Sequence, residues 1–163
     1  MKSFIKNMQE PKNGLILCHA CHPSGRCMFG IHIEDLLPEG KVLARMRVPA
    51  AFEASPGVAH GGWTAALLDE VCGHVPIRLG SFSVTGKLSI DYIKPVPIGV
   101  DLEIIAWAIS HKSSRWKIAG ELRLVGGGTL LSRAEGLFIE RDMEHYEEHV
   151  AWLSDFKKDG GKS

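Results

Sequence analysis

Residues 60–75 read HGGWTAALLDEVCGHV, and this stretch decides the fold. It is rich in Ala and Leu, contains no run of β-branched residues, and carries acidic charge only at Asp69 and Glu70. This pattern predicts a helix that is apolar nearly all round and therefore buried. Pro76 and Gly80 follow it and are expected to end it.

Segments of alternating apolar and polar residues flank this helix and predict strands. On the N-terminal side, residues 26–34 and 41–48 are separated by the turn-forming Pro38-Glu39-Gly40 and predict a hairpin. On the C-terminal side four strand candidates follow in succession: 81–94, 100–110, 115–125 and 130–140. Their short connections predict antiparallel neighbours, because a parallel return needs a crossover of a dozen or more residues.

The alternation also assigns faces to the predicted strands. Within residues 81–94, one face is expected to carry Phe82, Val84, Leu88, Ile90 and Tyr92, and the other Ser83, Thr85, Lys87, Ser89 and Asp91. Apolar residues on the outer register of the later strands predict an oligomer interface: Ile105, Trp107, Ile109, Leu131, Leu137 and Ile139. The order of elements predicts an α+β domain in which one long antiparallel sheet of about six strands curls around one apolar helix.

The chain divides into an N-terminal arm (1–14), one domain (15–142) and a C-terminal part (143–163). We expect an amphipathic surface helix over 144–156 and a frayed tail over 157–163. Lys and Arg number 19, as do Asp and Glu, so no basic surplus indicates a nucleic-acid partner or a membrane surface. No apolar run suits a membrane span or a signal peptide, which favours the cytoplasm.

The start of the predicted helix carries the strongest indication of chemistry. Gly61 and Gly62 stand where the first N–H groups of a helix are unpaired, which suits an oxyanion hole. Asp69 lies eight residues further on, about 12 Å along the helix, among apolar residues where a carboxylate is costly. Asp69 either acts in catalysis or, like Glu70 beside it, faces water at the helix edge. His60 is a candidate catalytic residue as an orienting or capping group before the glycine pair. The alternative, a buried structural histidine bonded to backbone, is favoured for its side chain.

Two further groups are open to more than one interpretation. Cys18, Cys21 and Cys27 include the C-x2-C spacing of a zinc knuckle, but the second ligand pair of such a site is missing, so reduced thiols are favoured over a metal. Trp63 suits the core, and as a neighbour of the glycines it also suits the wall of an acyl pocket.

Two segments, PGVAHGGWTAALLDEVCG (56–73) and SVTGKLSIDYIKPVPIG (83–99), resemble the hotdog-fold acyl-CoA thioesterases of the PaaI-like type, in the subgroup with the signature HGG, six residues, Asp. The resemblance covers about residues 15–140. It implies a hotdog fold and a thioesterase that hydrolyses an acyl-CoA to a carboxylic acid and CoA. It implies no cofactor, since coenzyme A is part of the substrate, and assembly as a homodimer or a dimer of dimers (homotetramer).

The resemblance also implies roles for individual residues. Asp69 corresponds to the catalytic carboxylate, as general base or nucleophile, and Gly61, with Gly62 beside it, to the oxyanion hole. Thr85 corresponds to a hydroxyl that helps to hold the water or the carboxylate. Arg115 matches a basic position suited to the phosphates of coenzyme A. A polar amide that many members carry six positions before the histidine is replaced here by Ala54, with Glu53 or Ser55 as the available substitutes.

Two other functions stay open from the sequence. A hotdog hydratase or dehydratase would need a histidine paired with a carboxylate, for which His60 and His74 are available, but its Asp-x-Asn-Pro-x-His run does not occur. A non-catalytic acyl-CoA-binding sensor would bind the same ligand without turnover. The acyl group, and whether coenzyme A or a carrier protein bears it, is not decided by the sequence.

Overall fold

The computed structural model describes residues 14–126 and 128–158. The strands of the main sheet are β1 (Ile31–Leu36), β2 (Val42–Arg47), β5 (Ser83–Tyr92), β6 (Asp101–Lys112), β7 (Arg115–Leu124) and β8 (Leu130–Glu140). A small hairpin is formed by β3 (Glu53–Ser55) and β4 (Val58–Ala59). The long helices are α2 (Gly61–Arg78) and α3 (Met143–Lys158), and single 3-10 turns occur at Pro38–Gly40 and Ala50–Phe52.

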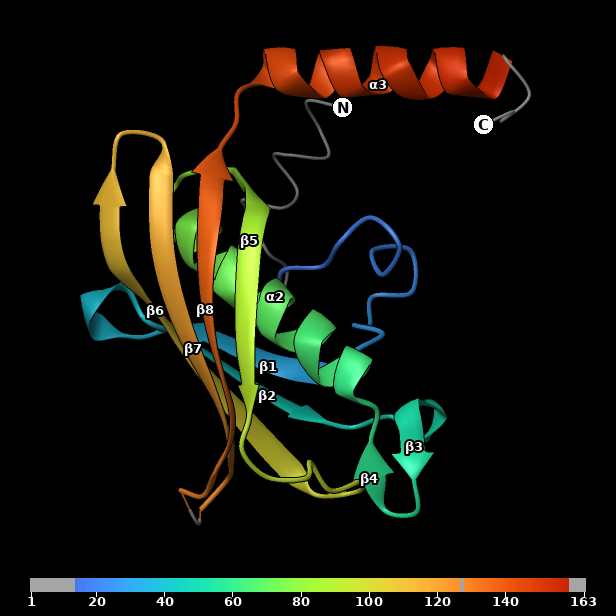
Figure 1. Ribbon diagram of the computed structural model, residues 1–163, viewed down its shortest axis with the longest axis vertical. Helices are drawn as coiled ribbons and strands as arrows, with labels where there is room; N and C mark the ends of the chain where they lie inside the picture. The colour runs from blue at the N-terminus through green and yellow to red at the C-terminus, as the bar shows by residue number, and fades with distance from the viewer. Residues whose placement is uncertain (1–13, 127, 159–163) are drawn as a thin grey trace.

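The six long strands form one sheet in the order β1-β2-β6-β7-β8-β5, and every neighbouring pair is antiparallel. The sheet curves around α2, which lies along its concave face (Figure 1). This arrangement confirms the predicted α+β class and the hotdog fold.

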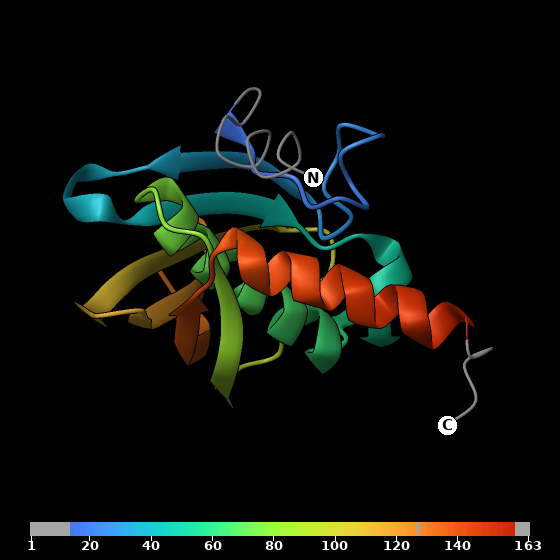
Figure 2. The same ribbon diagram turned by 90° about the horizontal axis from the view of Figure 1, so that it is seen from above.

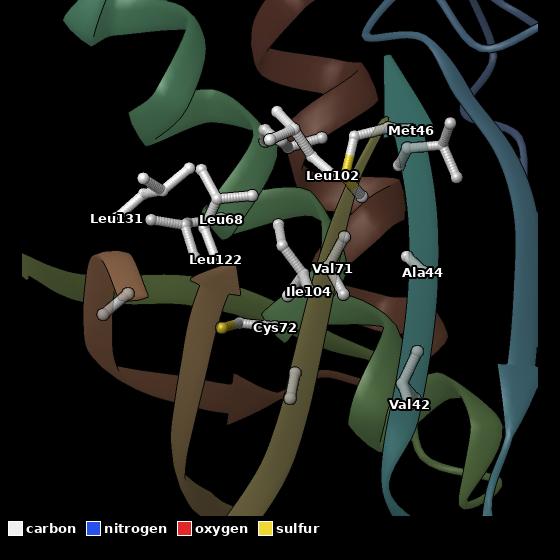
Figure 3. Packing of buried hydrophobic residues seen from close by; sticks show 14 of the residues in the cluster. Val42, Ala44, Met46, Leu68, Val71, Cys72, Leu102, Ile104, Leu122 and Leu131 are labelled. Atoms are coloured by element: carbon white, nitrogen blue, oxygen red, sulfur yellow. The ribbon is translucent and has the colours of Figure 1, made fainter. Parts of the chain in front are cut away.

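The core fills the space between α2 and the sheet. Leu67, Leu68, Val71 and Cys72 of α2 are fully buried, as the Ala- and Leu-rich sequence predicted. Figure 3 shows part of this packing, with the labelled sheet residues Val42, Ala44, Met46, Leu102, Ile104, Leu122 and Leu131. Each large side chain buried in this way contributes about 1.5–3 kcal/mol of transfer free energy, so sheet and helix depend on each other.

The hairpin before α2 is confirmed, with β1 and β2 paired on either side of the Pro38–Gly40 turn. The first strand begins at Ile31 rather than at residue 26, because Gly30 at φ 83° forms a bend whose carbonyl accepts the Arg47 N–H. A Cβ at position 30 would lie 2.2 Å from the Arg47 carbonyl oxygen, so only glycine fits this approach.

The prediction that Pro76 ends the helix is wrong, because α2 continues to Arg78. Proline lacks an N–H, but this removes only one hydrogen bond in the last turn. The Leu79 N–H donates to the carbonyls of Val75 and Pro76, and the Ser81 N–H also donates to Pro76 O. These bonds close the helix just before Gly80, which adopts φ 85°.

The strand that follows α2 does not lie beside its successor. The connection between β5 and β6 was predicted to join antiparallel neighbours, but β5 is the edge strand next to β8, and β6 lies between β2 and β7. Residues 95–99 instead run past the start of α2, next to residues 57–59. There the Ala59 N–H donates to Val96 O and the Ile98 N–H to Gly57 O, both at 2.9 Å. Two prolines in this connection cannot donate to a ladder, which favours a crossing over a hairpin.

The predicted faces of β5 are wrong at its start. The register shifts between Thr85, which is opposite Phe138, and Lys87, which is opposite Leu137, so Gly86 is an extra residue in a β-bulge. Before the bulge Thr85 shares the helix-facing side with the buried Phe138, and after it Leu88 and Ile90 do so. The alternation of apolar and polar residues assumes one register along the whole strand, so it could not predict that the two faces reverse at Gly86.

The outer face of the sheet is partly as predicted. Ile105, Trp107, Leu137 and Ile139 are half-buried and Ile109 is 45% exposed, but Leu131 is buried in the core. Leu131 is the unpaired residue at a second irregularity, since Leu122 pairs with Ser132 and Arg123 with Leu130. The bulge turns Leu131 inward.

The predicted C-terminal helix is confirmed as α3, which extends beyond the sheet (Figures 1 and 2). Its first turn is attached through Tyr146, whose ring meets that of Phe82 edge-on at 4.9 Å between centroids. Lys157 and Lys158 belong to this helix rather than to a frayed tail. Residues 1–13 of the predicted arm and residues 159–163 of the predicted tail lie outside the described residues. Among the described helices, none is long and apolar enough to cross a membrane.

Candidate active site

The first turn of α2 leaves one backbone amide open. His60 caps the helix, and its Nδ1 accepts the Gly62 N–H at 2.9 Å. The Trp63 and Thr64 N–H groups both donate to His60 O. Of the four amides at this end, only that of Gly61 has no recorded acceptor within residues 14–126 and 128–158.

This geometry distinguishes the two predicted glycines. The Gly62 amide is occupied by the His60 ring, so the expectation that both amides are open is wrong for Gly62. Gly61 has the open N–H and lies at the positive end of an 18-residue helix. His60 is the helix cap that was one of its two predicted roles, and it is exposed rather than buried.

Asp69 is held by the strand that follows the helix. The Thr85 hydroxyl donates a hydrogen bond of 2.8 Å to Asp69 Oδ1. Burial raises the pKa of Asp69, the Thr85 hydrogen bond offsets part of this rise, and the charge of Glu70 adds to it. A half-buried carboxylate with a raised pKa and one fixed oxygen is typical of a group that takes a proton or attacks a carbon. The structure therefore joins two of the predicted residues, Asp69 and Thr85.

Gly61 and Asp69 of one chain are not joined in this way. They lie eight residues apart on a continuous helix, a rise of about 12 Å. One carbonyl group cannot touch both, because its oxygen must come within about 3 Å of the amide while its carbon comes within reach of the carboxylate.

The remaining predicted site residues lie apart from these two groups. Trp63 is 2% exposed and belongs to the core, where its ring centroid is 6.5 Å from that of Phe52. Its indole Nε1 has no partner among the described residues. Arg115 is exposed at the start of β7, opposite Ile139 of β8. Glu53, a substitute for the missing amide, is engaged in the β3-β4 turn by the Gly57 N–H.

The cysteines near the N-terminus are free thiols in a folded loop. The Cys21 N–H donates to Cys18 O at 3.1 Å, and Cys21 Sγ accepts the Met28 N–H at 3.2 Å. Burial raises the pKa of Cys27 to about 11, so this thiol stays protonated at neutral pH. Within the described residues, no three His, Cys, Asp or Glu side chains are grouped to hold a metal ion.

Tyr92 is a residue of this region that the sequence did not indicate as functional. Its hydroxyl donates to Gly61 O at 3.1 Å from the end of β5. A hollow of about 320 Å³ lies beside it, lined in part by Gly61, Thr64, Tyr92 and Lys94. β5 runs back along α2, since Thr85 bonds to Asp69 in the middle of the helix and Tyr92 to Gly61 at its start. Spacing in the sequence gave no sign of this contact.

His74 belongs to a buried charged cluster on the other side of α2. Its Nδ1 lies 2.6 Å from Glu34 Oε2 and its Nε2 3.5 Å from Glu70 Oε1. Arg78 completes the cluster with two bonds to Glu34 Oε1, at 2.7 and 3.0 Å. Burial disfavours the imidazolium, but the hydrogen bonds and charges of the two glutamates outweigh this and raise the pKa of His74 to about 9. His74 is therefore protonated at neutral pH and enclosed.

Residues 56–131, which include Gly61, Asp69 and Thr85, match the family model of the thioesterase superfamily. This match covers just under half of the chain. The curated acyl-coenzyme A thioesterase THEM4 of Bos taurus is 30% identical over 93 residues, which are 57% of this chain and 38% of that protein. The chain thus spans less than half the length of this relative.

Solved structures of the superfamily share the fold. A crystal structure of a thioesterase superfamily protein is 28% identical with a TM-score of 0.63, covering 67% of this chain and 55% of that one. A hypothetical thioesterase protein of Streptococcus pneumoniae, solved with coenzyme A, is 24% identical with a TM-score of 0.63, covering 68% of this chain and 88% of that one. At this identity the likeness to the second shows the fold alone.

Proposed function

We propose that the protein is an acyl-CoA thioesterase, which hydrolyses an acyl-CoA thioester to a carboxylic acid and free CoA. The observation that carries the proposal is the pair of Asp69, fixed by Thr85, and the open amide of Gly61 on one helix of a thioesterase-superfamily domain. An amide aimed at a developing oxyanion and a carboxylate with a raised pKa are the two parts that acyl transfer to water requires.

The proposed chemistry begins at the thioester carbonyl, whose oxygen accepts a hydrogen bond from the Gly61 N–H. In one route Asp69 takes a proton from water, the water oxygen bonds to the carbonyl carbon, and the C–S bond breaks as the sulfur leaves as thiolate and is then protonated. In the other route a carboxylate oxygen of Asp69 attacks the carbon and expels the thiolate, and water then hydrolyses the mixed anhydride. Thr85 holds the second oxygen of the carboxylate in either route.

The distance of about 12 Å between Gly61 and Asp69 supports a site made by two copies of the chain. In this proposal, Gly61 of one protomer and Asp69 of another meet at one thioester, so a symmetric dimer contains two such sites. The protein then acts as a homodimer or as a dimer of dimers. In a dimer of dimers, the apolar outer face of the sheet, with Ile105, Trp107 and Ile109, is available for the contact between the two dimers.

The relatives support coenzyme A as the carrier of the acyl group. The named relative is an acyl-coenzyme A thioesterase, and the Streptococcus pneumoniae structure contains coenzyme A. A hypothetical thioesterase of the same organism has been solved in two variants, one with alanine replacing an aspartate at its position 52 and the other with alanine replacing a threonine at its position 68. These positions are 16 residues apart, as are Asp69 and Thr85 here.

Other parts of the proposal rest on the sequence. No cofactor is needed, since the reaction uses only water and the two groups described above. Arg115 is proposed to meet the phosphates of coenzyme A, and Trp63 to support the acyl pocket from within the core. The acyl-CoA is the proposed small-molecule partner, without a nucleic acid or a membrane. A location in the cytoplasm stays a prediction.

The charged cluster argues against the alternative of a hydratase or dehydratase. That reaction needs a histidine free to take a proton from the carbon next to the carbonyl. His74 has carboxylates at both ring nitrogens, is 4% exposed and has a pKa raised to about 9. His60 uses its Nδ1 to accept the Gly62 N–H. The non-catalytic sensor is distinguished from the thioesterase only by the absence of turnover.

The first test is the release of free thiol from CoA thioesters with short aliphatic, long aliphatic and aromatic acyl groups. We expect Asp69→Asn to lower kcat at least 100-fold, since it removes the base or the nucleophile. Asp35→Asn is the matched control, because Asp35 is an exposed carboxylate on β1. Wild-type turnover by folded Asp69→Asn would refute the proposal, and tight ester binding without turnover would favour the sensor.

The amide of Gly61 can be tested by Gly61→Pro, which deletes the N–H and adds the proline ring. Proline is favoured at the first helical position, and His60 has the extended conformation (φ −62°, ψ 135°) that must precede it. An added Cβ would lie 3.6 Å from the Tyr92 ring, an ordinary contact. We expect Gly61→Pro to lose turnover about 100-fold and Gly61→Ala, which keeps the N–H, to lose much less.

Mixing the two inactive variants tests the shared site. A heterodimer of Gly61→Pro and Asp69→Asn contains one site with both changes and one with neither, if each site takes Gly61 from one chain and Asp69 from the other. We therefore expect activity to return when the variants are unfolded and refolded together. No recovery, with heterodimers detected by mass spectrometry, would refute the two-copy site.

A further inference from the structure

We propose that Tyr92 is a positioning and specificity-determining residue, which holds Gly61 through its hydroxyl and forms with its ring the wall beside the thioester carbonyl. This inference rests on the proposed thioesterase function.

The hydroxyl of Tyr92 is attached to the residue that carries the open amide. It donates to Gly61 O at 3.1 Å, and Tyr92 is the last residue of β5. The strand end is itself fixed, because the Ile93 and Lys94 N–H groups both donate to Leu131 O at 2.9 Å. A rigid strand end therefore sets the position of the first helical residue from outside the helix.

The ring of Tyr92 lies against the bare α-carbon of Gly61. A Cβ built at position 61 would be 3.6 Å from Cε1 and 3.9 Å from both Cζ and the hydroxyl oxygen. No side chain at position 61 separates the ring from the amide, although Tyr92 is 58% exposed. A carbonyl that bonds to the Gly61 N–H would bring its attached carbon atoms close to this aromatic face.

The hollow beside the ring suits an apolar group. Its walls include Val58 and Val96, and the chain around them is braced by the Ala59 N–H bond to Val96 O at 2.9 Å. Lys94 is the charged residue in the lining. A volume of about 320 Å³ accepts a short acyl or aryl group but not a long chain folded within it. The hollow and the ring together determine which acyl groups fit next to the carbonyl.

The two roles of Tyr92 are separated by two substitutions. Tyr92→Phe keeps the ring and removes the hydrogen bond, so we expect kcat to fall three- to tenfold with KM within twofold, the effect of losing one neutral hydrogen bond. Tyr92→Ala removes the wall as well, and we expect its loss of kcat/KM to be larger for aromatic and short acyl groups than for long aliphatic ones.

The control is Tyr146→Phe, because the chain has two tyrosines and the Tyr146 hydroxyl, on α3, has no partner among the described residues. It should keep the wild-type kcat for every ester. An unchanged kcat in Tyr92→Phe would overturn the positioning role. A loss in Tyr92→Ala that is equal for all acyl groups would overturn the specificity role and place the ring beside the pantetheine arm.

A binding experiment tests Tyr92 without turnover. A CoA ketone, with CH2 in place of the thioester sulfur, keeps the carbonyl, whereas an S-alkyl CoA thioether lacks it. We expect Tyr92→Phe to weaken the ketone three- to tenfold and leave the thioether unchanged, as measured by calorimetry. Equal affinities for the ketone in wild type and Tyr92→Phe would overturn the inference. If the ketone shift is seen but no thiol is released from any ester by the wild type, the hydrolase proposal fails and the role of Tyr92 stands.

Discussion

The buried cluster of Glu34, His74, Glu70 and Arg78 gives a sharp prediction about stability and pH. The His74 ring is enclosed between β1 and α2, where it is 4% exposed, and Glu34 is 2% exposed. The two glutamates raise the pKa of His74 from 6.5 to about 9 despite burial. A raised pKa means that the folded protein binds a proton more tightly than the unfolded chain does.

The sign and size of the effect follow from this difference. Below pH 6.5 both states are protonated at His74, and the stabilisation is fully present. As the pH rises, the unfolded chain loses the proton first, so the free energy of unfolding falls until the folded state also deprotonates near pH 9. A difference of this size amounts to about 3 kcal/mol, which is a large fraction of the stability of a small domain.

The assay is urea unfolding at fixed protein concentration between pH 6 and pH 9, comparing the wild type with His74→Gln. At pH 6 we expect the variant to be less stable by about 3–5 kcal/mol, since Glu34 is left buried with one partner fewer. Towards pH 9 the difference should shrink by about 3 kcal/mol. Burial also raises the pKa of Cys27 and Cys72, but both proteins contain these thiols and their contribution cancels.

His22→Gln is the control, because His22 is exposed in the N-terminal loop. It should follow the wild-type curve at every pH. A constant difference between wild type and His74→Gln across the range would show that folding does not raise the pKa of His74. In that case the argument that an imidazolium at this position cannot serve as a hydratase base would also fail.

Two further predictions concern the site and the core. Thr85→Val removes the hydroxyl that lowers the pKa of Asp69, so the acidic limb of kcat/KM against pH should move to higher pH, and Thr85→Ser should restore it. An unmoved limb would contradict the role given to the Thr85 bond. Gly120→Ala places a Cβ 2.7 Å from Cys72 Sγ and should destabilise the fold by about 1–3 kcal/mol in urea unfolding. Gly120→Ala combined with Cys72→Ala should recover part of this loss, and no loss in the single variant would contradict the predicted clash.

The sequence predicted which segments form helices and strands better than it predicted which of them lie side by side. Ala, Leu and a lack of β-branched runs define α2, and alternation defines the strands, because both patterns follow local geometry. The place of β5 at the sheet edge depends on where residues 95–99 cross, and a connection of five residues is also short enough for a tight return, although its two prolines favour a crossing. The end of α2 was misplaced for a related reason, since Pro76 costs little in a last turn whose carbonyls are bonded by Leu79 and Ser81.

In the candidate site too, local features could be predicted from the sequence, whereas contacts between distant residues could not. Asp69 and the glycine pair could be predicted because each is unusual in its own surroundings, a carboxylate among apolar residues and a helix start without side chains. Which amide is open could not, because it depends on the rotamer of His60, whose ring bonds to Gly62. Tyr92 was missed because its partner, Gly61, is 31 residues away and the contact depends on how β5 packs against α2.

Gly86 shows how a small irregularity connects the fold to the proposed chemistry. Strict alternation along β5 would place Thr85 on the side opposite Leu88 and Ile90, away from α2. The bulge at Gly86 reverses the faces, so that Thr85 meets Asp69 while Leu88 and Ile90 still pack in the core. A Cβ at position 86 would lie 3.3 Å from Ile139 Cγ1, a tight contact that glycine avoids. The sheet thus keeps its apolar face and supplies one hydroxyl to the helix, which is the contact on which the proposed role of Asp69 depends.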